Sequence, residues 1–220
     1  MTLKDNERLD DLQFNNLFII QNSQEYLFTS DAVHLANYVK VKKGGRVIDL
    51  CSGSGIIGIL VGAKNDVKDV VLVELQEHLA DMSRRSIEYN KIDNVSVVCN
   101  KLQGVYKIVG ANSFDVVVCN PPYKKKGTAT LLNEKESIAM ARHEIEVTLE
   151  EIVVESNKLL KYGGELYMIN KEERLTDMLV IFRKYGIEPK ELKIIPSLKG
   201  ANVIMLKGKK GGKSGIKISL

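Results

Sequence analysis

The sequence has few of the side chains that build disulfide frameworks or metal centres. Among its 220 residues are three cysteines, Cys51, Cys99 and Cys119, and three histidines. The cysteine count is odd, and there is neither a Cys-x-x-Cys pair nor a His–Cys cluster, which argues against disulfides and against zinc. Because each cysteine follows an apolar run, we expect three buried, free thiols and no bound metal.

Long apolar stretches are also missing. No window approaches the roughly 18 consecutive apolar residues of a membrane span, and residues 1–16 contain no signal-peptide core. We therefore expect a soluble, cytoplasmic protein. The length allows one large domain or two small ones. The net charge of +4 and the pI near 8.8 hint at a polyanionic partner without establishing one.

What the chain does contain is an alternation of strand-like and helix-like segments. Uniformly apolar runs predict strands over 46–50, 69–75, 95–99, 114–119 and 165–170, with later candidates at 192–197 and 201–208. Helices are predicted over 54–64, 76–91, 146–164 and 172–186, and another begins at Thr29 or Ser30. Strands that are apolar throughout indicate an α/β fold with a mainly parallel sheet covered by helices on both faces.

The stretch DLCSGSGIIG, residues 49–58, follows a predicted strand and opens a predicted helix. Gly53, Gly55 and Gly58 match the G-x-G-x-x-G pattern of dinucleotide-binding proteins, but several cofactors use a glycine turn at this place. Asp49 stands four residues before the first glycine, and a carboxylate there would repel a pyrophosphate while suiting an amino or hydroxyl donor. Glu74 ends the next strand, where an acidic residue can accept both hydroxyls of a ribose. A nicotinamide-dependent dehydrogenase is therefore disfavoured.

This segment resembles motif I of the S-adenosylmethionine-dependent methyltransferases, whose fold is a Rossmann-like class I domain with seven strands, the last antiparallel. The resemblance implies that the Gly53–Gly55 turn lies against the methionine and ribose of the cofactor, that Asp49 lies near its amino group, and that Glu74 holds its ribose. Methyltransferases often carry an acidic residue near the adenine amine, where this chain has Asn100. The further cofactor contacts that the resemblance implies are Phe28, Cys51, Leu75, Lys101 and Asn120.

A rigid polar corner, NPPY, follows the strand predicted at 114–119. Asn120 offers a side-chain carbonyl and Pro121 a backbone carbonyl, and the Pro121–Pro122 pair fixes the backbone so that both oxygens can face one point. Tyr123 adds an aromatic face. Two acceptors beside a ring suit a planar group with an NH2, whose nitrogen lone pair can then turn towards an activated methyl group.

The corner resembles the NPPY motif of amino-methyltransferases, in which Asn120, Pro121, Pro122 and Tyr123 would form the catalytic site. FTSDAVHLA (28–36), ARHE (141–144) and the stretch 200–218 further resemble the bacterial family that methylates N6 of an adenine in the valine tRNA anticodon loop. That resemblance implies a tRNA adenine-N6 methyltransferase. An rRNA guanine N2-methyltransferase and a release-factor glutamine N5-methyltransferase remain as alternatives.

Basic residues fit an RNA partner. Lys124, Lys125 and Lys126 directly follow Tyr123, and Arg142 belongs to the ARHE stretch. Phosphate contacts from such side chains add affinity without carrying sequence information. We expect residues 1–45 to be an N-terminal extension that packs on the core, residues 46–207 to be the methyltransferase domain, and residues 208–220 to be a mobile basic tail.

Overall fold

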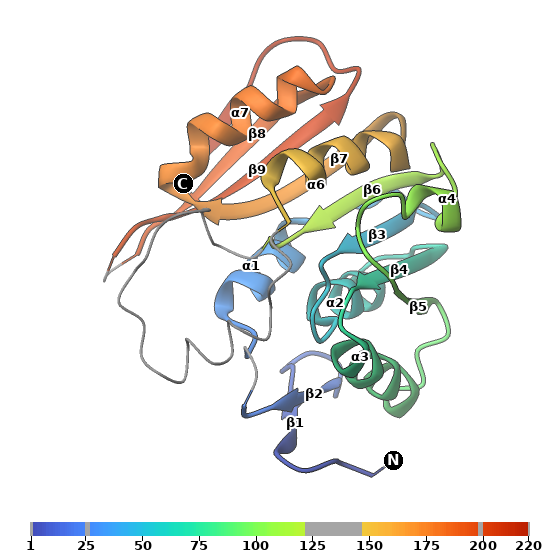
Figure 1. Ribbon diagram of the computed structural model, residues 1–220. Coiled ribbons are helices and arrows are strands. Elements are labelled where there is room, and N and C mark those ends of the chain that lie inside the picture. Colours follow the sequence, from blue (N-terminus) through green and yellow to red (C-terminus); the bar gives the residue numbers. More distant parts are fainter. Residues whose placement is uncertain (1, 25–26, 122–146, 198–199, 220) are drawn as a thin grey trace.

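The computed structural model describes residues 2–24, 27–121, 147–197 and 200–219. Its strands are β1 (Glu7–Asp11), β2 (Phe18–Asn22), β3 (Arg46–Leu50), β4 (Asp69–Glu74), β5 (Val95–Cys99), β6 (Phe114–Cys119), β7 (Leu160–Lys171), β8 (Ile187–Ile195), β9 (Val203–Lys210) and β10 (Lys217–Ser219). Its helices are α1 (Ser30–Tyr38), α2 (Ile56–Lys64), α3 (Glu77–Tyr89), α4 (Tyr106–Val109), α6 (Leu149–Leu159), the 3-10 turn Glu172–Arg174 and α7 (Leu175–Lys184). Figure 1 shows their arrangement.

The central sheet has the strand order β10-β8-β9-β7-β6-β3-β4-β5. Its strands pair in parallel except at β9, which runs antiparallel to both β7 and β8. The prediction of a Rossmann-like, mostly parallel sheet is confirmed, with one difference: the sheet has eight strands in place of seven. The additional strand is the short β10, which pairs with β8 in parallel and so gives residues 217–219 a place in the sheet instead of a mobile tail.

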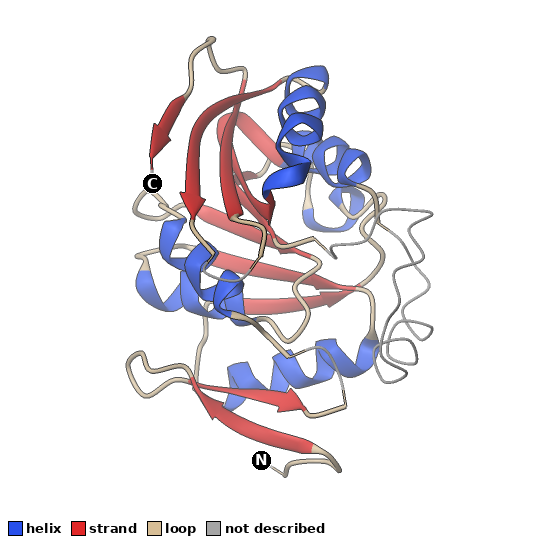
Figure 2. Ribbon diagram, turned by 90° about the vertical axis from the view of Figure 1, so that its left-hand side faces the viewer, coloured by secondary structure: helices blue, strands red, loops and turns tan. Residues whose placement is uncertain are grey.

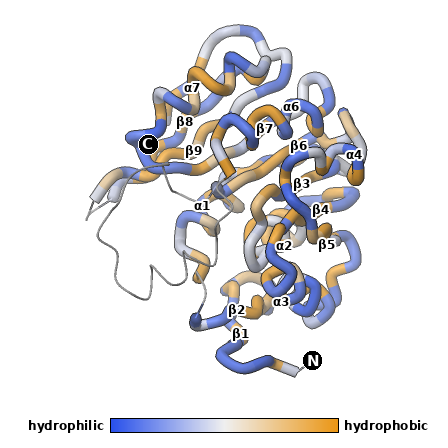
Figure 3. Tube along the Cα trace, in the orientation of Figure 1, coloured by the Kyte–Doolittle hydropathy of each residue, from blue (hydrophilic) through white to orange (hydrophobic). Residues whose placement is uncertain are grey.

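Two apolar clusters, one on each face of the sheet, form the core. Along β3, Val47 belongs to the cluster packed with α1 and α2, whereas Ile48 belongs to the cluster packed with α6 and α7. Successive strand residues point to opposite faces, so a strand buried on both faces is apolar at most positions, and buried polar residues such as Asp49 are exceptions. Figure 2 shows helices on both sides of the sheet, and Figure 3 shows apolar residues concentrated along the central strands.

The prediction of a helix over 146–164 is wrong at the C-terminal end, where it extends too far. The structure ends α6 at Leu159, and Leu160 already pairs with Phe114 of β6. The glycines that were expected to close the helix lie instead within β7, where the register against β6 shifts between Leu160 and Glu165. Gly163 adopts a φ of +80°, which other residues reach only with strain. Pairing with a distant strand therefore overrides a local helical pattern.

A second, two-stranded sheet precedes the core and was not predicted. β1 and β2 form an antiparallel hairpin, and the free edge of β2 lies on α3 rather than on another strand. The Ile20 backbone N–H donates to Ser86 Oγ at 2.9 Å, and the Phe18 N–H donates to Asn90 Oδ1 at 2.9 Å. Helix side chains thus satisfy backbone groups that an exposed strand edge would leave open.

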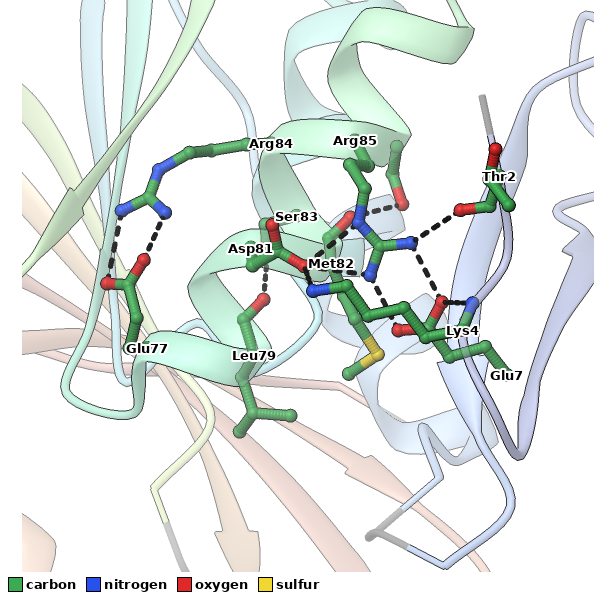
Figure 4. Close-up of polar contacts among 11 residues, drawn as sticks. Thr2, Lys4, Glu7, Glu77, Leu79, Asp81, Met82, Ser83, Arg84 and Arg85 are labelled. Carbon is green, nitrogen blue, oxygen red and sulfur yellow. Dashed lines mark hydrogen bonds and ion pairs between the residues drawn. The ribbon is translucent and has the colours of Figure 1, made fainter.

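Charged side chains reinforce the attachment of the hairpin to α3 (Figure 4). The Arg85 guanidinium donates to both oxygens of Glu7, at 2.6 and 2.8 Å, and to Asp81 at 2.9 Å. Glu7 is almost fully buried in this contact, and the hydrogen bond from Arg85 holds its pKa below the usual value. Planar two-point pairing of this kind fixes orientation as well as distance. The hairpin is therefore held in one position on α3.

Candidate active site

The glycine loop lies at the C-terminal end of β3 and leads into α2. Cys51, Gly53 and Gly55 have φ values of +58°, +56° and +85°, so this turn depends on residues that tolerate the left-handed region. The loop closes through a hydrogen bond from the Gly55 N–H to the Ser52 carbonyl at 2.8 Å. Gly53 has open space where a Cβ would stand, which leaves the backbone accessible to a ligand.

Asp49 stands at the root of the loop and is fully buried. Its Oδ2 accepts a hydrogen bond from the Gly58 N–H in the first turn of α2 at 2.9 Å, whereas its Oδ1 has no partner. Burial, opposed in part by the Gly58 hydrogen bond, raises the pKa of this carboxyl to about 8. The side chain fastens the helix to the strand and keeps one unsatisfied oxygen.

Glu74 ends β4 beside the loop and is also buried. Its Oε2 accepts from the Gly53 N–H at 2.8 Å and its Oε1 accepts from the Gln76 N–H at 2.9 Å. Burial raises its pKa, while these backbone hydrogen bonds act in the opposite direction. A carboxylate oxygen can accept more than one hydrogen bond, so each retains capacity for a ribose hydroxyl. The acidic residue and the glycine turn therefore form one unit.

This unit fits S-adenosylmethionine. Asp49 Oδ1 and Ser52 Oγ are buried polar atoms without a partner, and buried groups of this kind normally find one. Asp49 is the next-to-last residue of β3 and Ser52 lies just after the strand, where a polar ligand can satisfy both atoms. The open space at Gly53 provides room for that ligand. The cofactor would be held here by Glu74 and the glycine loop.

The structure brings three further residues expected to contact the cofactor to the same edge of the sheet. The Asn100 N–H donates to the Glu74 carbonyl at 2.9 Å, so Asn100 lies next to Glu74 at the strand tips. Leu75 is one of the few large apolar residues that are exposed, at 36%, and Lys101 is exposed beyond Asn100. An exposed leucine beside a buried carboxylate can cover one face of a flat ring.

Asn120 and Pro121 follow β6 directly. β6 pairs with β3 in parallel, with Cys119 opposite Leu50, so Asn120 lies beside the start of the glycine loop. Asn120 is half-buried and Pro121 is buried. Pro122, Tyr123, Lys124–Lys126 and Arg142 lie outside the described residues. The part of the NPPY corner that the structure describes is thus next to the donor loop.

The three cysteines are free, as the sequence predicts. Cys119 is buried, whereas Cys51 and Cys99 are only half-buried, contrary to the expectation for all three. Burial and the neighbouring Cys51 thiol raise the pKa of Cys119. Cys51 lies in the glycine turn and Cys99 at a strand tip, where the chain leaves the core.

Gln21, a residue that contacts the glycine loop, was missed by sequence reasoning. Gln21 of β2 is 1% exposed, and its Nε2 donates to Ser54 Oγ in the glycine loop at 2.8 Å. Its Oε1 accepts from the Phe28 N–H at 3.0 Å. Phe28 itself is half-buried and packs against the cluster of α1 and α2. A glutamine within an apolar run gives no signal in the sequence that it reaches a loop 33 residues away.

The basic residues near the C-terminus lie away from this site. Lys209 pairs in register with Glu165, which lies opposite Val116 near the start of β6, whereas the site lies at the C-terminal end of that strand. Lys207 forms an ion pair with Glu191, and Lys210 donates to backbone carbonyls of Asn157 and Leu160. Exposed lysines also precede β3 and β4 at that far edge: Lys40, Lys42, Lys43 and Lys68. We call this set, with Lys209, the far basic edge.

The fold and the site together define a Rossmann-like methyltransferase domain: a mostly parallel sheet with a glycine loop after one central strand and an acidic residue at the tip of the next. Residues 30–182 match the family described as the methyltransferase small domain. The chain belongs to this family of S-adenosylmethionine-dependent methyltransferases, and S-adenosylmethionine is its methyl donor.

The curated relatives that match this chain are identical to it at about a quarter of the aligned positions or fewer. The tRNA1(Val) (adenine(37)-N6)-methyltransferase of Shewanella halifaxensis is 22% identical over 160 residues, which make up 72% of this chain and 63% of that protein. The protein of the same name from Photobacterium profundum is 24% identical over 168 residues, 74% of this chain and 68% of that protein. The chain thus spans less than two-thirds of the first relative.

Solved structures share the fold. P. horikoshii TYW2 in complex with MeSAdo matches 95% of this chain and 73% of that one, with a TM-score of 0.66 and 15% identity. M. jannaschii TYW2 in complex with AdoMet matches 96% of this chain and 89% of that one, with a TM-score of 0.64 and 13% identity.

In the described ranges of this chain no helix is long and apolar enough to cross a membrane, and no cluster of three or more His, Cys, Asp or Glu could hold a metal.

Proposed function

We propose that the protein transfers a methyl group from S-adenosylmethionine to the exocyclic N6 amine of an adenine in tRNA. The observation that carries the proposal is the position of Asn120 and Pro121, at the tip of β6 and beside the donor loop at the tip of β3. The curated relatives named as tRNA adenine-N6 methyltransferases support the choice of substrate. A tRNA substrate would place the enzyme in the cytoplasm.

The described residues suit attack by an amine that is not deprotonated beforehand. The Asn120 side-chain carbonyl and the Pro121 backbone carbonyl would accept the two amine hydrogens and hold the nitrogen with its lone pair towards the donor. The donor supplies an electrophilic methyl group on a sulfonium. Hydrogen bonds to the amine strengthen as positive charge develops on nitrogen, so alignment and electrostatic stabilisation provide the rate enhancement.

The remaining NPPY residues complete the proposal. Pro122 would fix the corner and Tyr123 would stack on the base. Lys124, Lys125, Lys126 and Arg142 would contact phosphates around the base, which steers RNA binding without reading sequence. A base in an anticodon loop is partly unstacked, so turning it into the site requires only a few kcal/mol.

The nucleosides of tRNA from a deletion strain test the substrate. Loss of N6-methyladenosine, restored by the wild-type gene, is the expected outcome. Loss of an N2-methylguanosine from rRNA, with tRNA unchanged, would instead support the guanine methyltransferase. Loss of methylglutamine from a release factor would support the protein methyltransferase, so each result identifies one substrate.

Asn120→Ala tests the catalytic role. We expect methyl transfer to tRNA to fall at least 100-fold, because an acceptor for the amine is lost, while the Kd for S-adenosylmethionine changes less than about threefold. The measurement pairs single-turnover transfer of labelled methyl with calorimetric donor binding. Lys209→Ala at the far basic edge serves as the control and should retain transfer. Full transfer by Asn120→Ala would contradict the assignment.

A further inference from the structure

Gln21 joins two segments that are distant in the sequence. One is the glycine loop, reached through Ser54 Oγ at 2.8 Å, and the other is the stretch before α1, reached through the Phe28 N–H at 3.0 Å. Gln21 itself is 1% exposed, so its amide depends on these two protein partners, which are half-buried. The primary amide donates to one segment and accepts from the other on a single side chain.

The position of Gln21 is itself fixed. β2 is attached to α3 through Ser86 and Asn90. α3 in turn reaches the glycine loop through Ser83 Oγ, whose one proton is shared between the Gly53 carbonyl at 3.2 Å and the Leu79 carbonyl at 3.1 Å. The loop is therefore held from two sides, by Ser83 of α3 and by Gln21 of β2. A rigid side chain between rigid elements can set the position of a loop.

We propose that Gln21 is a positioning residue for methyl-donor binding: it sets the glycine loop and the stretch around Phe28 in the spacing that S-adenosylmethionine requires. The proposal rests on the methyltransferase assignment of the glycine loop and not on the identity of the RNA. It gives the N-terminal hairpin a role in donor affinity, although the hairpin precedes the whole methyltransferase sheet.

Loss of the amide would leave two polar groups without their partner. In Gln21→Met the side chain keeps its length and apolar volume, but the Phe28 N–H and Ser54 Oγ both lose a hydrogen bond. The two segments would then separate or reorient in the free protein, and donor binding would have to restore their spacing. A loop that must be ordered on binding lowers affinity.

Donor binding by calorimetry, without RNA, tests the proposal. We expect Gln21→Met to raise the Kd for S-adenosylmethionine about tenfold and to speed hydrogen exchange of the glycine-loop amides. The rate of transfer at saturating donor should stay within about twofold, so that the change falls on KM for the donor and not on kcat. Failure of the tRNA assignment would leave this binding result unaffected.

A matched control separates positioning from general stability. Asn157 of α6 also bridges two segments, because its Nδ2 donates to the Tyr185 carbonyl at 2.8 Å, and it lies on the opposite face of the sheet. Asn157→Leu should lower the melting temperature while leaving the donor Kd within twofold. If Gln21→Met changes donor affinity no more than Asn157→Leu, the proposal is overturned.

A double-mutant cycle shows whether Gln21 acts through the loop. Ser54→Ala removes the same hydrogen bond from the other side and keeps the test valid should Gln21→Met fail to fold. If the contact is shared, Gln21→Met combined with Ser54→Ala weakens donor binding about as much as Gln21→Met alone. If the two substitutions instead act independently, their effects on the donor Kd multiply. A Kd raised nearly 100-fold in the double variant would therefore contradict coupling through Ser54.

Discussion

The two buried carboxyl groups of the donor site differ in how their oxygens are satisfied. Both oxygens of Glu74 accept backbone N–H groups, whereas Asp49 has one bonded oxygen and one without a partner. Burial penalises the charged form of each. Asp49 has fewer hydrogen bonds to offset that penalty, so its pKa rises to about 8 and the group is largely protonated at neutral pH in the donor-free protein.

This difference predicts a pH-dependent stability. The Asp49 carboxyl binds a proton up to pH about 8 in the folded chain but only up to its ordinary pKa of 3.8 in the unfolded chain. The folded state therefore holds more protons between these values, and the free energy of unfolding falls as pH rises through them. Asp49→Asn keeps an acceptor for the Gly58 N–H and cannot ionise. We expect urea unfolding to show a larger stability advantage of the variant at pH 8.5 than at pH 5.

A difference between variant and wild type that stays constant over that pH range would contradict the assignment of a neutral Asp49. The comparison must use donor-free protein, because a bound cofactor changes the charges around the carboxyl.

At this scale the sequence predicts only part of the site. Asp49, Glu74, Asn100 and Asn120 could be placed because parallel strands bring their C-terminal ends to one edge. Gln21 and Ser83 could not, since their contacts with the loop depend on how the hairpin and α3 pack. Neither residue is marked by its neighbours in the sequence.

At the scale of the elements, Gly58 allows α2 to pack closely against β4. A Cβ at this position would stand 2.1 Å from Leu72 Cδ2 and 3.3 Å from Val70 Cγ1. The helix therefore approaches the strand as closely as a glycine permits, which also brings its first turn to Asp49. The third glycine of the loop serves packing, as the dinucleotide-binding pattern requires of it.

Gly58→Ala should force the helix away from the sheet. We expect a loss of about 1–3 kcal/mol in the free energy of unfolding, measured by urea denaturation, together with weaker donor binding. Gly62→Ala is the matched comparison in the same helix, where a Cβ would meet Val95 Cγ2 at 2.9 Å, and it should cost less. Because alanine has the higher helix propensity at both positions, equal losses would show that the shorter contact with Leu72 adds no extra cost.

The elements that the sequence predicted best are those buried on both faces. β3, β4 and β6 fall almost where the apolar runs predict them, because burial of nearly every residue leaves a clear pattern. The edge strand β5 is also where its apolar run predicts it, although it is only partly buried. β1 was missed since its residues ERLDD are mostly polar, and they form a strand only by pairing with β2. The start of β7 was assigned to a helix because its pairing with β6 is not local.

In the molecule as a whole, the seven sheet strands β3 to β9 carry two additions at their margins: the β1–β2 hairpin on α3, and β10 beside β8 as the eighth strand of the sheet. β10 has three residues that are all at least partly exposed. It is held by pairing with β8 and by Lys190 Nζ, which donates to the carbonyls of Lys213 and Gly215. Few apolar contacts join it to the core.

Truncation after Gly212 should therefore leave the methyltransferase domain intact. We expect the melting temperature to fall by only a few degrees and the donor Kd to stay within twofold, because the described residues 213–219 belong to neither core cluster. Thermal denaturation and calorimetry measure the two effects. Truncation before Val203, which removes core residues of β9, should abolish folding. Loss of donor binding in the variant truncated after Gly212 would contradict the expectation that the methyltransferase domain does not depend on the removed residues.

The reversed direction of β9 has a consequence for handling the enzyme. It places Lys209 with the other members of the far basic edge, on the side of the sheet away from the donor loop. Because this edge attracts polyanions independently of the reaction side, a sulfated resin such as heparin would bind the protein even when the substrate pocket is damaged. Retention on such a column would therefore not by itself report whether the substrate pocket is intact.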